Sequence, residues 1–220
     1  MLQKEAVVPE MITMIKELQS NSLFKDHVLA GGTALTLQLG HRTSTDIDLF
    51  TQKPQNAIEL VNYFKKHYNN IKIDVAENDF TRIFANDIKV EMVQYEENII
   101  EDIKNVENIR LFGKNEIAAM KLSTITKRTE PRDFIDISYL LKEISLEKMF
   151  ELYKEKFGTI SPLYMKRTLL IKSKKIKDNE WLVGGIKMLR HDIQPKDVPV
   201  FIEKAIEEYN ETFNIGKQTL

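Results

Sequence analysis

Two aspartates, Asp46 and Asp48, flank a single isoleucine at the head of an apolar run. Side chains on a β-strand alternate between two faces, so both carboxylates would project from one face while Ile47 and Leu49 point into the core. Two carboxylates held this close repel each other and raise each other's pKa unless a cation lies between them. The pair is therefore either solvated or a site for a hard divalent metal, Mg²⁺ or Mn²⁺.

Two adjacent glycines, Gly31 and Gly32, precede a helical pattern a short distance before these aspartates. A turn without side chains lets a phosphate approach backbone N–H groups, and a helix N-terminus carries a partial positive charge. Thr33 is the expected N-cap of this helix, and Ser44 lies in the polar loop ahead of Asp46. Each motif alone also fits an ordinary turn or an acidic loop. Their order predicts that a phosphate site and a metal site lie close together.

A third carboxylate would strengthen this interpretation, because two-metal chemistry on phosphates needs a further oxygen ligand. Glu91 is the candidate, since it shares a predicted strand face with the apolar Val93 and Tyr95, where an acid requires a partner. A half-exposed strand face explains Glu91 equally well. Asp74 is the alternative ligand.

A second group of charges lies further along the chain, on two predicted helices. Lys121 and Arg128 follow one polar side of the helix 115–128 and could both face a triphosphate. On the next helix, Asp133 and Asp136 lie one turn apart on the same flank. The ordinary alternative is that all four are solvated surface charges.

The composition sets limits on the class of protein. The chain has 220 residues, 42% of them hydrophobic, a formal net charge of -1 and no cysteine. The near-zero charge does not indicate a nucleic-acid or membrane-surface protein, so any basic surface must be local. No apolar run approaches the roughly 20 residues of a membrane span, which predicts a protein without a membrane partner that works in the cytoplasm.

Hydrophobic periodicity predicts two lobes, at residues 1–110 and 111–220, and an α/β (α+β) fold class. The first lobe would contain a mixed sheet flanked by helices, and the second would be helical. The expected strands are 28–30, 46–50, 71–76, 80–85 and 88–95, with a hairpin at Asn86-Asp87. The expected helices are 8–19, 33–39, 54–70, 115–128, 132–142, 146–157, one behind Pro162, and 198–209.

Three segments together resemble the AbiEii/AbiGii toxin family of nucleotidyltransferases, which have the DNA polymerase β type fold. They are GGTAL, HRTSTDIDLF, and AAMKL followed by R-x-x-x-R-D-F-I-D-I, and they span Leu29 to Leu141. The resemblance implies an enzyme that binds a nucleoside triphosphate with Mg²⁺ and transfers the nucleotidyl group. Members act in toxin–antitoxin pairs or in abortive infection, and some modify the acceptor end of tRNA. The implied partners are therefore the triphosphate, tRNA or another RNA acceptor, and a cognate antitoxin.

The resemblance also implies roles for individual residues. Gly31 and Gly32 match the phosphate-binding turn, Asp46 and Asp48 the metal pair, Lys121 the nucleotide-contacting lysine, and Asp136 the acid that serves as base. Glu91 falls where the family has a third acid, commonly Asp. The Gly-Ser of the wider superfamily is Gly-Gly here, so Thr33 or the backbone would replace the serine contact.

Two alternatives remain open from the sequence. The chain could be an inactive nucleotidyltransferase fold that binds an antitoxin or RNA, or an enzyme that modifies a small molecule. The lysine run KSKKIK at 172–177 could attract RNA phosphate or form an ordinary soluble surface. No HExxH, G-x-S-x-G or Walker A pattern occurs, which argues against those other catalytic sites.

Overall fold

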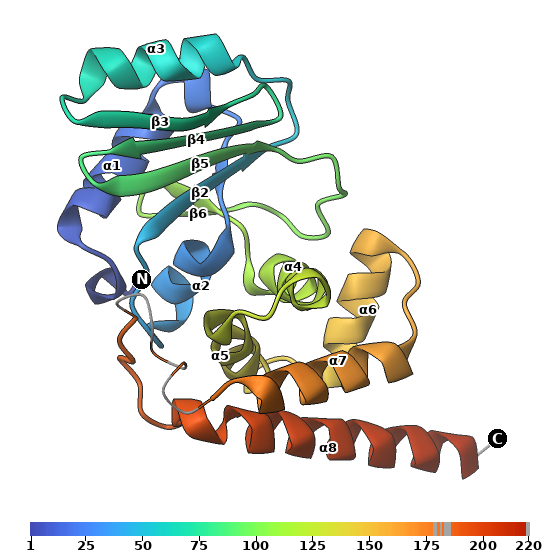
Figure 1. Cartoon of the computed structure of the whole chain (residues 1–220). Helices are drawn as coiled ribbons and strands as arrows, with labels where there is room; N and C mark the ends of the chain where they lie inside the picture. The colour runs from blue at the N-terminus through green and yellow to red at the C-terminus, as the bar shows by residue number, and fades with distance from the viewer. Residues whose placement is uncertain (178–179, 181, 183–185, 219–220) are drawn as a thin grey trace. The chain divides into compact units, whose positions relative to one another are not determined.

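A mixed seven-stranded sheet, in the order β3-β4-β5-β2-β1-β7-β6, forms the centre of the first half of the chain in the computed structural model. The structure describes residues 1–177, 180, 182 and 186–218, with side chains described as far as residue 212. The chain divides into two units, Met1–Gly113 and Lys114–Leu220 (Figure 1). Residues 111–113 belong to the first unit, beyond the predicted boundary at 110, because Leu111 pairs with Leu29 in the sheet.

The first unit alternates short strands with helices. Its helices are α1 (Pro9–Ser20), α2 (Gly31–Leu39) and α3 (Ala57–His67), with 3-10 turns η1 (Lys4–Ala6) and η2 (Ser22–Phe24). Its strands are β1 (Val28–Leu29), β2 (Asp46–Thr51), β3 (Ile71–Ala76), β4 (Phe80–Ala85), β5 (Ile88–Gln94), β6 (Lys104–Val106) and β7 (Ile109–Leu111). The predicted mixed sheet with flanking helices is confirmed.

Two of the strand pairs are parallel, β2 with β5 and β1 with β7, and the others are antiparallel. The predicted hairpin at Asn86-Asp87 is confirmed, with positive φ at both residues. A second hairpin, β6–β7, was not predicted. It turns through Glu107 and Asn108, which also have positive φ, as a two-residue hairpin turn requires.

One face of the sheet is apolar. Ile47 on β2 lies beside Val90 on β5, which lies beside Ile83 on β4, and all three side chains are fully buried. Leu49 and Met92 form the next buried row. Since side chains alternate along each strand, the neighbouring residues of β2, β4 and β5 must point to the opposite face.

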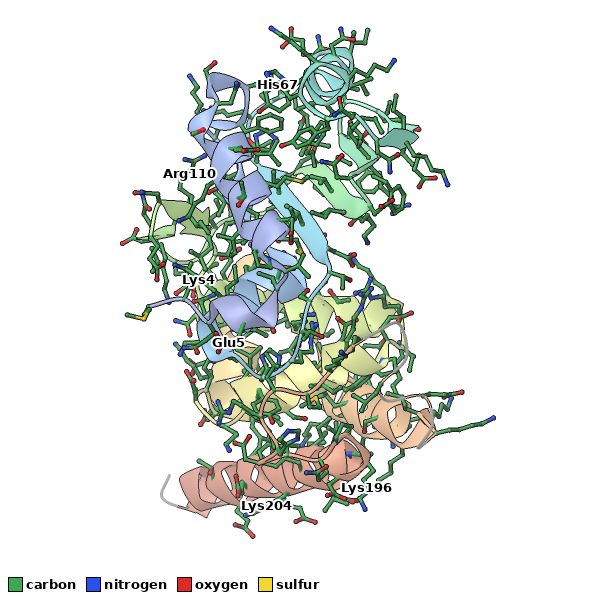
Figure 2. All side chains as sticks on the ribbon, turned by 90° about the vertical axis from the view of Figure 1, so that its left-hand side faces the viewer. Lys4, Glu5, His67, Arg110, Lys196 and Lys204 are labelled. Atoms are coloured by element: carbon green, nitrogen blue, oxygen red, sulfur yellow. The ribbon has the colours of Figure 1, made fainter. Side chains whose placement is uncertain are left out.

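Long-range hydrogen bonds join strand β7 to α1 and to the turn that follows it. The guanidinium of Arg110, labelled in Figure 2, donates to the carbonyls of Gln19 and Phe24 at 2.9–3.0 Å. The side chain of Gln19 in turn bonds the backbone of Arg110 in both directions, at 2.8 Å each. Strand β7 is therefore held to the first helix of the chain, which supports the β1–β7 pairing.

The second unit is helical, as predicted. It comprises α4 (Lys114–Lys127), α5 (Pro131–Leu140), α6 (Leu146–Phe157), α7 (Pro162–Lys175) and α8 (Val198–Gln218), with a 3-10 turn η4 (Pro195–Asp197) before α8. In Figure 1, α7 and α8 run side by side. A buried ion pair between Lys156 on α6 and Glu116 on α4, both side chains fully buried, joins two of these helices.

The lysine run at the end of α7 is used within this unit. The ammonium of Lys172 donates to the carbonyls of Ile125, Thr126 and Arg128 at 2.6–3.2 Å, and so caps the C-terminus of α4. Lys174 forms an ion pair with Glu203 on α8 at 2.8 Å. These two lysines therefore stabilise helix packing.

Among the residues that the structure describes, no helix has the length and apolar character to cross a bilayer.

Candidate active site

Strand β2 presents Asp46 and Asp48 on the face of the sheet opposite the apolar core. The side chains of this strand alternate between partly buried and buried, and Ile47 and Leu49 are fully buried. The expected alternation therefore holds, and both carboxylates project from one face.

The glycine turn lies directly against one of these carboxylates. Gly31 follows β1 at the start of α2 and has a φ of +66°, a backbone conformation that residues with a side chain rarely adopt. A Cβ at Gly31 would lie 2.1 Å from Oδ2 of Asp48. The backbone of the turn thus approaches Asp48 as only glycine permits, and with Gly32 it begins a helix whose N-cap, Ala30, makes no side-chain hydrogen bond.

Thr33 does not cap this helix, which corrects the prediction. The helix begins two residues earlier, and the Thr33 hydroxyl donates to the carbonyl of Asp46. Ser44 Oγ lies 2.8 Å from Thr33 Oγ1, so Ser44 donates to Thr33. Both hydroxyls join α2 to the loop that leads into β2. They fix the start of the strand, and Thr33 is only 1% exposed.

Strand β5 lies parallel to β2 and places two charged residues opposite the aspartates. Lys89 pairs with Asp46 and Glu91 pairs with Asp48 in the strand register. The Lys89 ammonium lies 3.1 Å from Asp46 Oδ2 and 3.3 Å from Glu91 Oε1. On β4, Arg82 lies opposite Glu91 and donates to the same Oε1 at 2.7 Å.

The network extends one strand further, where Arg82 also binds Asp74 at 3.0 Å. Asp74, the alternative third ligand, is therefore joined to the site through Arg82. The linked groups are four acids and two bases, a formal charge of −2: Asp46, Asp48, Asp74 and Glu91 with Arg82 and Lys89.

This excess of negative charge appears in the pKa values. Burial, followed by the charges of Glu91 and Asp46, raises the pKa of Asp48 from 3.8 to about 7. Burial also acts to raise the pKa of Glu91, but the hydrogen bond from Arg82 and the charge of Lys89 outweigh it and hold that pKa below its usual value. Asp48 and Glu91 are partners in the strand register, so the negative charge of Glu91 acts directly on Asp48.

The chemistry of these donors fits a hard divalent cation. All are carboxylate oxygens, which Mg²⁺ and Mn²⁺ prefer, and a cation would offset both the burial and the repulsion that raise the pKa of Asp48. Over the described part of the chain, no three acidic or histidine side chains are arranged as a ready cage. The reason is visible in the contacts, because Asp46 and Glu91 are turned toward Lys89 and Arg82. Asp46 and Asp48 could hold the metal, with Glu91 available if Lys89 moves.

The second unit contains its own cluster around Lys121. The ammonium of Lys121 on α4 lies 2.7 Å from Asp133 Oδ1 and 2.6 Å from Asp136 Oδ2, both on α5. Both carboxylates are fully buried, and Lys121 is 6% exposed. Arg128 binds the other oxygen of Asp133 at 2.9 Å while its side chain stays half exposed. These four groups are thus ion-paired rather than solvated surface charges.

Burial of Asp133 acts to raise its pKa, but Lys121 and Arg128 outweigh this effect and lower the pKa below its usual value. The carboxylate is therefore ionised and fixes the positions of two cations. Asp136 faces the same ammonium, so in this structure its oxygen accepts from Lys121. Its implied role as a base stays a prediction.

Sequence reasoning missed Lys89 and Arg82 as members of the site. Both lie on the sheet face of Glu91, two residues or one strand away, so alternation on 80–85 and 88–95 places them on the same face once the register is known. The β4–β5 hairpin sets the register of Arg82 and Glu91, whereas the parallel pairing of β2 with β5 places Lys89 opposite Asp46. No local pattern in the sequence reveals that parallel pairing.

Comparisons with known proteins identify the class. Residues 15–208 match the family described as nucleotidyl transferase AbiEii toxin, type IV toxin–antitoxin system. The match covers most of the chain, which therefore belongs to this family of toxin-type nucleotidyltransferases and is an enzyme that transfers phosphorus-containing groups.

A curated relative, uncharacterized protein aq_aa25 of Aquifex aeolicus, is 25% identical over 205 residues, which cover 90% of this chain and 94% of the relative. Two solved structures from Helicobacter pylori share the fold. JHP933 has 19% identity and a TM-score of 0.57 over 96% of this chain and 95% of its own. A protein described as a putative nucleotidyltransferase has 20% identity and a TM-score of 0.56 over 92% and 94%.

Proposed function

We propose that the chain transfers a nucleoside monophosphate from a nucleoside triphosphate to an RNA acceptor, with tRNA as the first candidate, and that it requires Mg²⁺ or Mn²⁺. In this proposal it is the toxin of a pair, and its protein partner is a cognate antitoxin. Membership of the AbiEii family supports the reaction class and the toxin role.

The contact between the glycine turn and Asp48 carries the proposal. A helix N-terminus and a metal-binding carboxylate must be close together if one triphosphate is to touch both. A Cβ at Gly31 would lie 2.1 Å from Asp48 Oδ2, so there is no room for a side chain between the start of α2 and this carboxylate. The first turn of α2 is therefore next to the carboxylate pair.

The chemistry is a single displacement at phosphorus. An acceptor hydroxyl oxygen bonds to the α-phosphorus, the bond to the bridging oxygen breaks, pyrophosphate leaves with the electron pair, and the hydroxyl proton is released. Asp46 and Asp48 would hold the metal, which supplies charge neutralisation at the phosphates when bound. The backbone N–H groups of the α2 turn bind phosphate oxygens, and Thr33 and Ser44 keep the β2 loop in position.

Lys121 and Arg128 remain proposed nucleotide-binding residues of the second unit. Asp133 would act as a positioning residue, because it contacts both Lys121 and Arg128. Asp136, whose oxygen lies 2.6 Å from the Lys121 ammonium, stays the proposed base. Their two negative charges balance Lys121 and Arg128, so the four groups together are formally neutral.

The test incubates the full-length protein with each labelled nucleoside triphosphate, Mg²⁺ and total RNA, followed by gel electrophoresis. Label should appear on RNA for at least one nucleotide. Asp46→Asn and Asp48→Asn should each reduce transfer by about a hundredfold or more, which is ~2.7 kcal/mol of transition-state stabilisation. The matched control is Asp87→Asn in the hairpin turn, which makes the same chemical change outside the site.

Two other outcomes would redirect the assignment. If calorimetry detects no nucleotide binding with Mg²⁺, the chain is a binding module of the same fold. If label is consumed but reaches neither RNA nor protein, the acceptor is a small molecule. Equal transfer by wild type and both aspartate variants would refute the site.

A further inference from the structure

Lys89 occupies the space between two carboxylates of the candidate metal site. Its ammonium contacts Asp46 Oδ2 at 3.1 Å and Glu91 Oε1 at 3.3 Å, and its side chain is 24% exposed. Strand register causes this placement, because Lys89 lies directly opposite Asp46 and two residues before Glu91 on the same face of β5. A cation of the chain itself therefore binds the oxygens that a metal would need.

Arg82 is also bound to Glu91, but its position is different. It bridges Glu91 and Asp74, away from β2, and its planar guanidinium is fixed by two carboxylates. Lys89 contacts Asp46, and its ammonium is a point charge on a flexible stem. Lys89 can leave the site by rotation of its side chain, whereas Arg82 can keep Glu91 ionised after that departure.

We propose that Lys89 is an internal counter-ion of the metal site, which leaves Asp46 and Glu91 when a divalent cation arrives and then binds phosphate oxygens of the triphosphate. This inference rests on the proposed function, because it takes Asp46 and Asp48 as the metal-binding pair. It adds a residue that controls when the metal binds.

The reason is a balance of charges. A divalent cation without nucleotide must displace the ammonium from two carboxylates and leave it beside a dication. When the triphosphate binds as well, the displaced ammonium gains an anionic partner. Lys89 should therefore weaken binding of the metal alone and strengthen binding of metal and triphosphate together, a positive coupling that must act equally in both directions.

The experiment compares wild type with Lys89→Met, which keeps the unbranched stem of the side chain, shortens it by one atom and removes the charge. Mn²⁺ alone is titrated into the full-length, nucleotide-free protein, and free Mn²⁺ is measured by electron paramagnetic resonance. Lys89→Met should bind Mn²⁺ about tenfold more tightly, a gain of ~1.4 kcal/mol. Calorimetry then measures four non-hydrolysable triphosphate analogues in Mg²⁺, and the best analogue should bind about fivefold more weakly to the variant.

Lys72→Met is the matched control. Register places Lys72 on β3 in the same row of the sheet as Lys89, across Phe84, so it lies on the same face about two strand spacings, or ~10 Å, away. Its ammonium lies over the Phe84 ring. The variant makes the same change in net charge and should leave both affinities near wild type. Lys89→Arg, which keeps the charge, should bind Mn²⁺ no more tightly than wild type.

The outcomes separate the two proposals. Opposite changes in the two affinities for Lys89→Met, absent from Lys72→Met, support the inference. Wild-type protein that binds Mn²⁺ and an analogue, with Lys89→Met unchanged or matched by Lys72→Met, overturns the role of Lys89 and leaves the proposed function intact. Wild-type protein that binds neither Mn²⁺ nor any analogue refutes the proposed function, and the inference with it. Thermal unfolding of each variant confirms that it is folded.

Discussion

Asp48→Asn should make the metal-free protein more stable while it removes activity. Burial, followed by the charges of Glu91 and Asp46, raises the pKa of the wild-type carboxylate from 3.8 to about 7. Asparagine keeps the shape of the side chain and removes the charge. The variant therefore removes a buried and repelled negative charge, which destabilises the folded wild type but not the unfolded chain.

The size of the effect follows from the displacement of the pKa. Between pH 4 and pH 7 the folded protein keeps a proton that the unfolded chain has lost, so the free energy of unfolding of wild type falls as the pH rises through this window. Each pKa unit corresponds to at most about 1.4 kcal/mol, so above pH 7 the wild type loses at most about 4 kcal/mol of its free energy of unfolding through this group. Burial is the largest cause of the shift, and asparagine stays buried at this position, so about half of that bound, ~2 kcal/mol, is the expected gain.

Thermal unfolding by circular dichroism in EDTA, at pH 5 and pH 8, measures the difference. Asp48→Asn should unfold about 4–8 °C above wild type at pH 8, with a smaller difference at pH 5. Asp46→Asn is the control, because Asp46 contacts Lys89 and its loss should give no such gain. A variant no more stable than wild type at pH 8, or equally stabilised at both pH values, would refute this account of the site.

Three further predictions concern other parts of the chain. Gly31→Ala should reduce transfer by about a hundredfold and lower the free energy of unfolding by about 1–3 kcal/mol. The control is Gly158→Ala, where φ is also positive but a Cβ would meet no atom within 4 Å, so only the backbone effect is expected. Equal losses of transfer and of thermal stability in the two variants would argue against contact with Asp48. Glu116→Gln should lower the free energy of unfolding, measured in urea, by about 3–5 kcal/mol because it removes the charge that faces buried Lys156. The control Glu151→Gln, in an exposed ion pair with Lys148, should lower it by about 0–1 kcal/mol. Similar losses in the two variants would contradict the argument. Lys172→Met should speed amide hydrogen exchange in the last turn of α4, where three carbonyls lose a donor, and unchanged exchange there would exclude the cap.

Local sequence patterns were sufficient to predict the bounds of those helices and strands that a few neighbouring residues define. Strands β3 and β4 and helix α6 have the predicted bounds, because alternation, a turn pair and a Ser145 N-cap define them. Helix α3 starts at Ala57 rather than near Pro54, since Asn56 caps it with bonds from two N–H groups. Strands β6 and β7 have three residues each, too few for alternation to be recognised.

The site shows the same division. That Asp46 and Asp48 share a face follows from alternation alone. The partners of Asp46 depend on which strand lies beside β2, and β5 is separated from it by two strands and a helix. Lys121 likewise contacts Asp133 across the turn between two helices, a geometry that helical spacing does not contain. Residue types were therefore predictable where one element positions them, and pairings between elements were not.

Strand β1 has two residues and lies between β2 and β7, so its outer neighbour comes from a segment about eighty positions later. During synthesis, the ribosome releases β1 and the glycine turn long before it releases β7. A nascent chain must therefore wait for residues near 111 to emerge before β1 acquires its second hydrogen-bonded neighbour. Until then, the carbonyl of Leu29, two residues before the glycine turn, lacks the hydrogen bond that the N–H of Phe112 donates to it in the folded sheet.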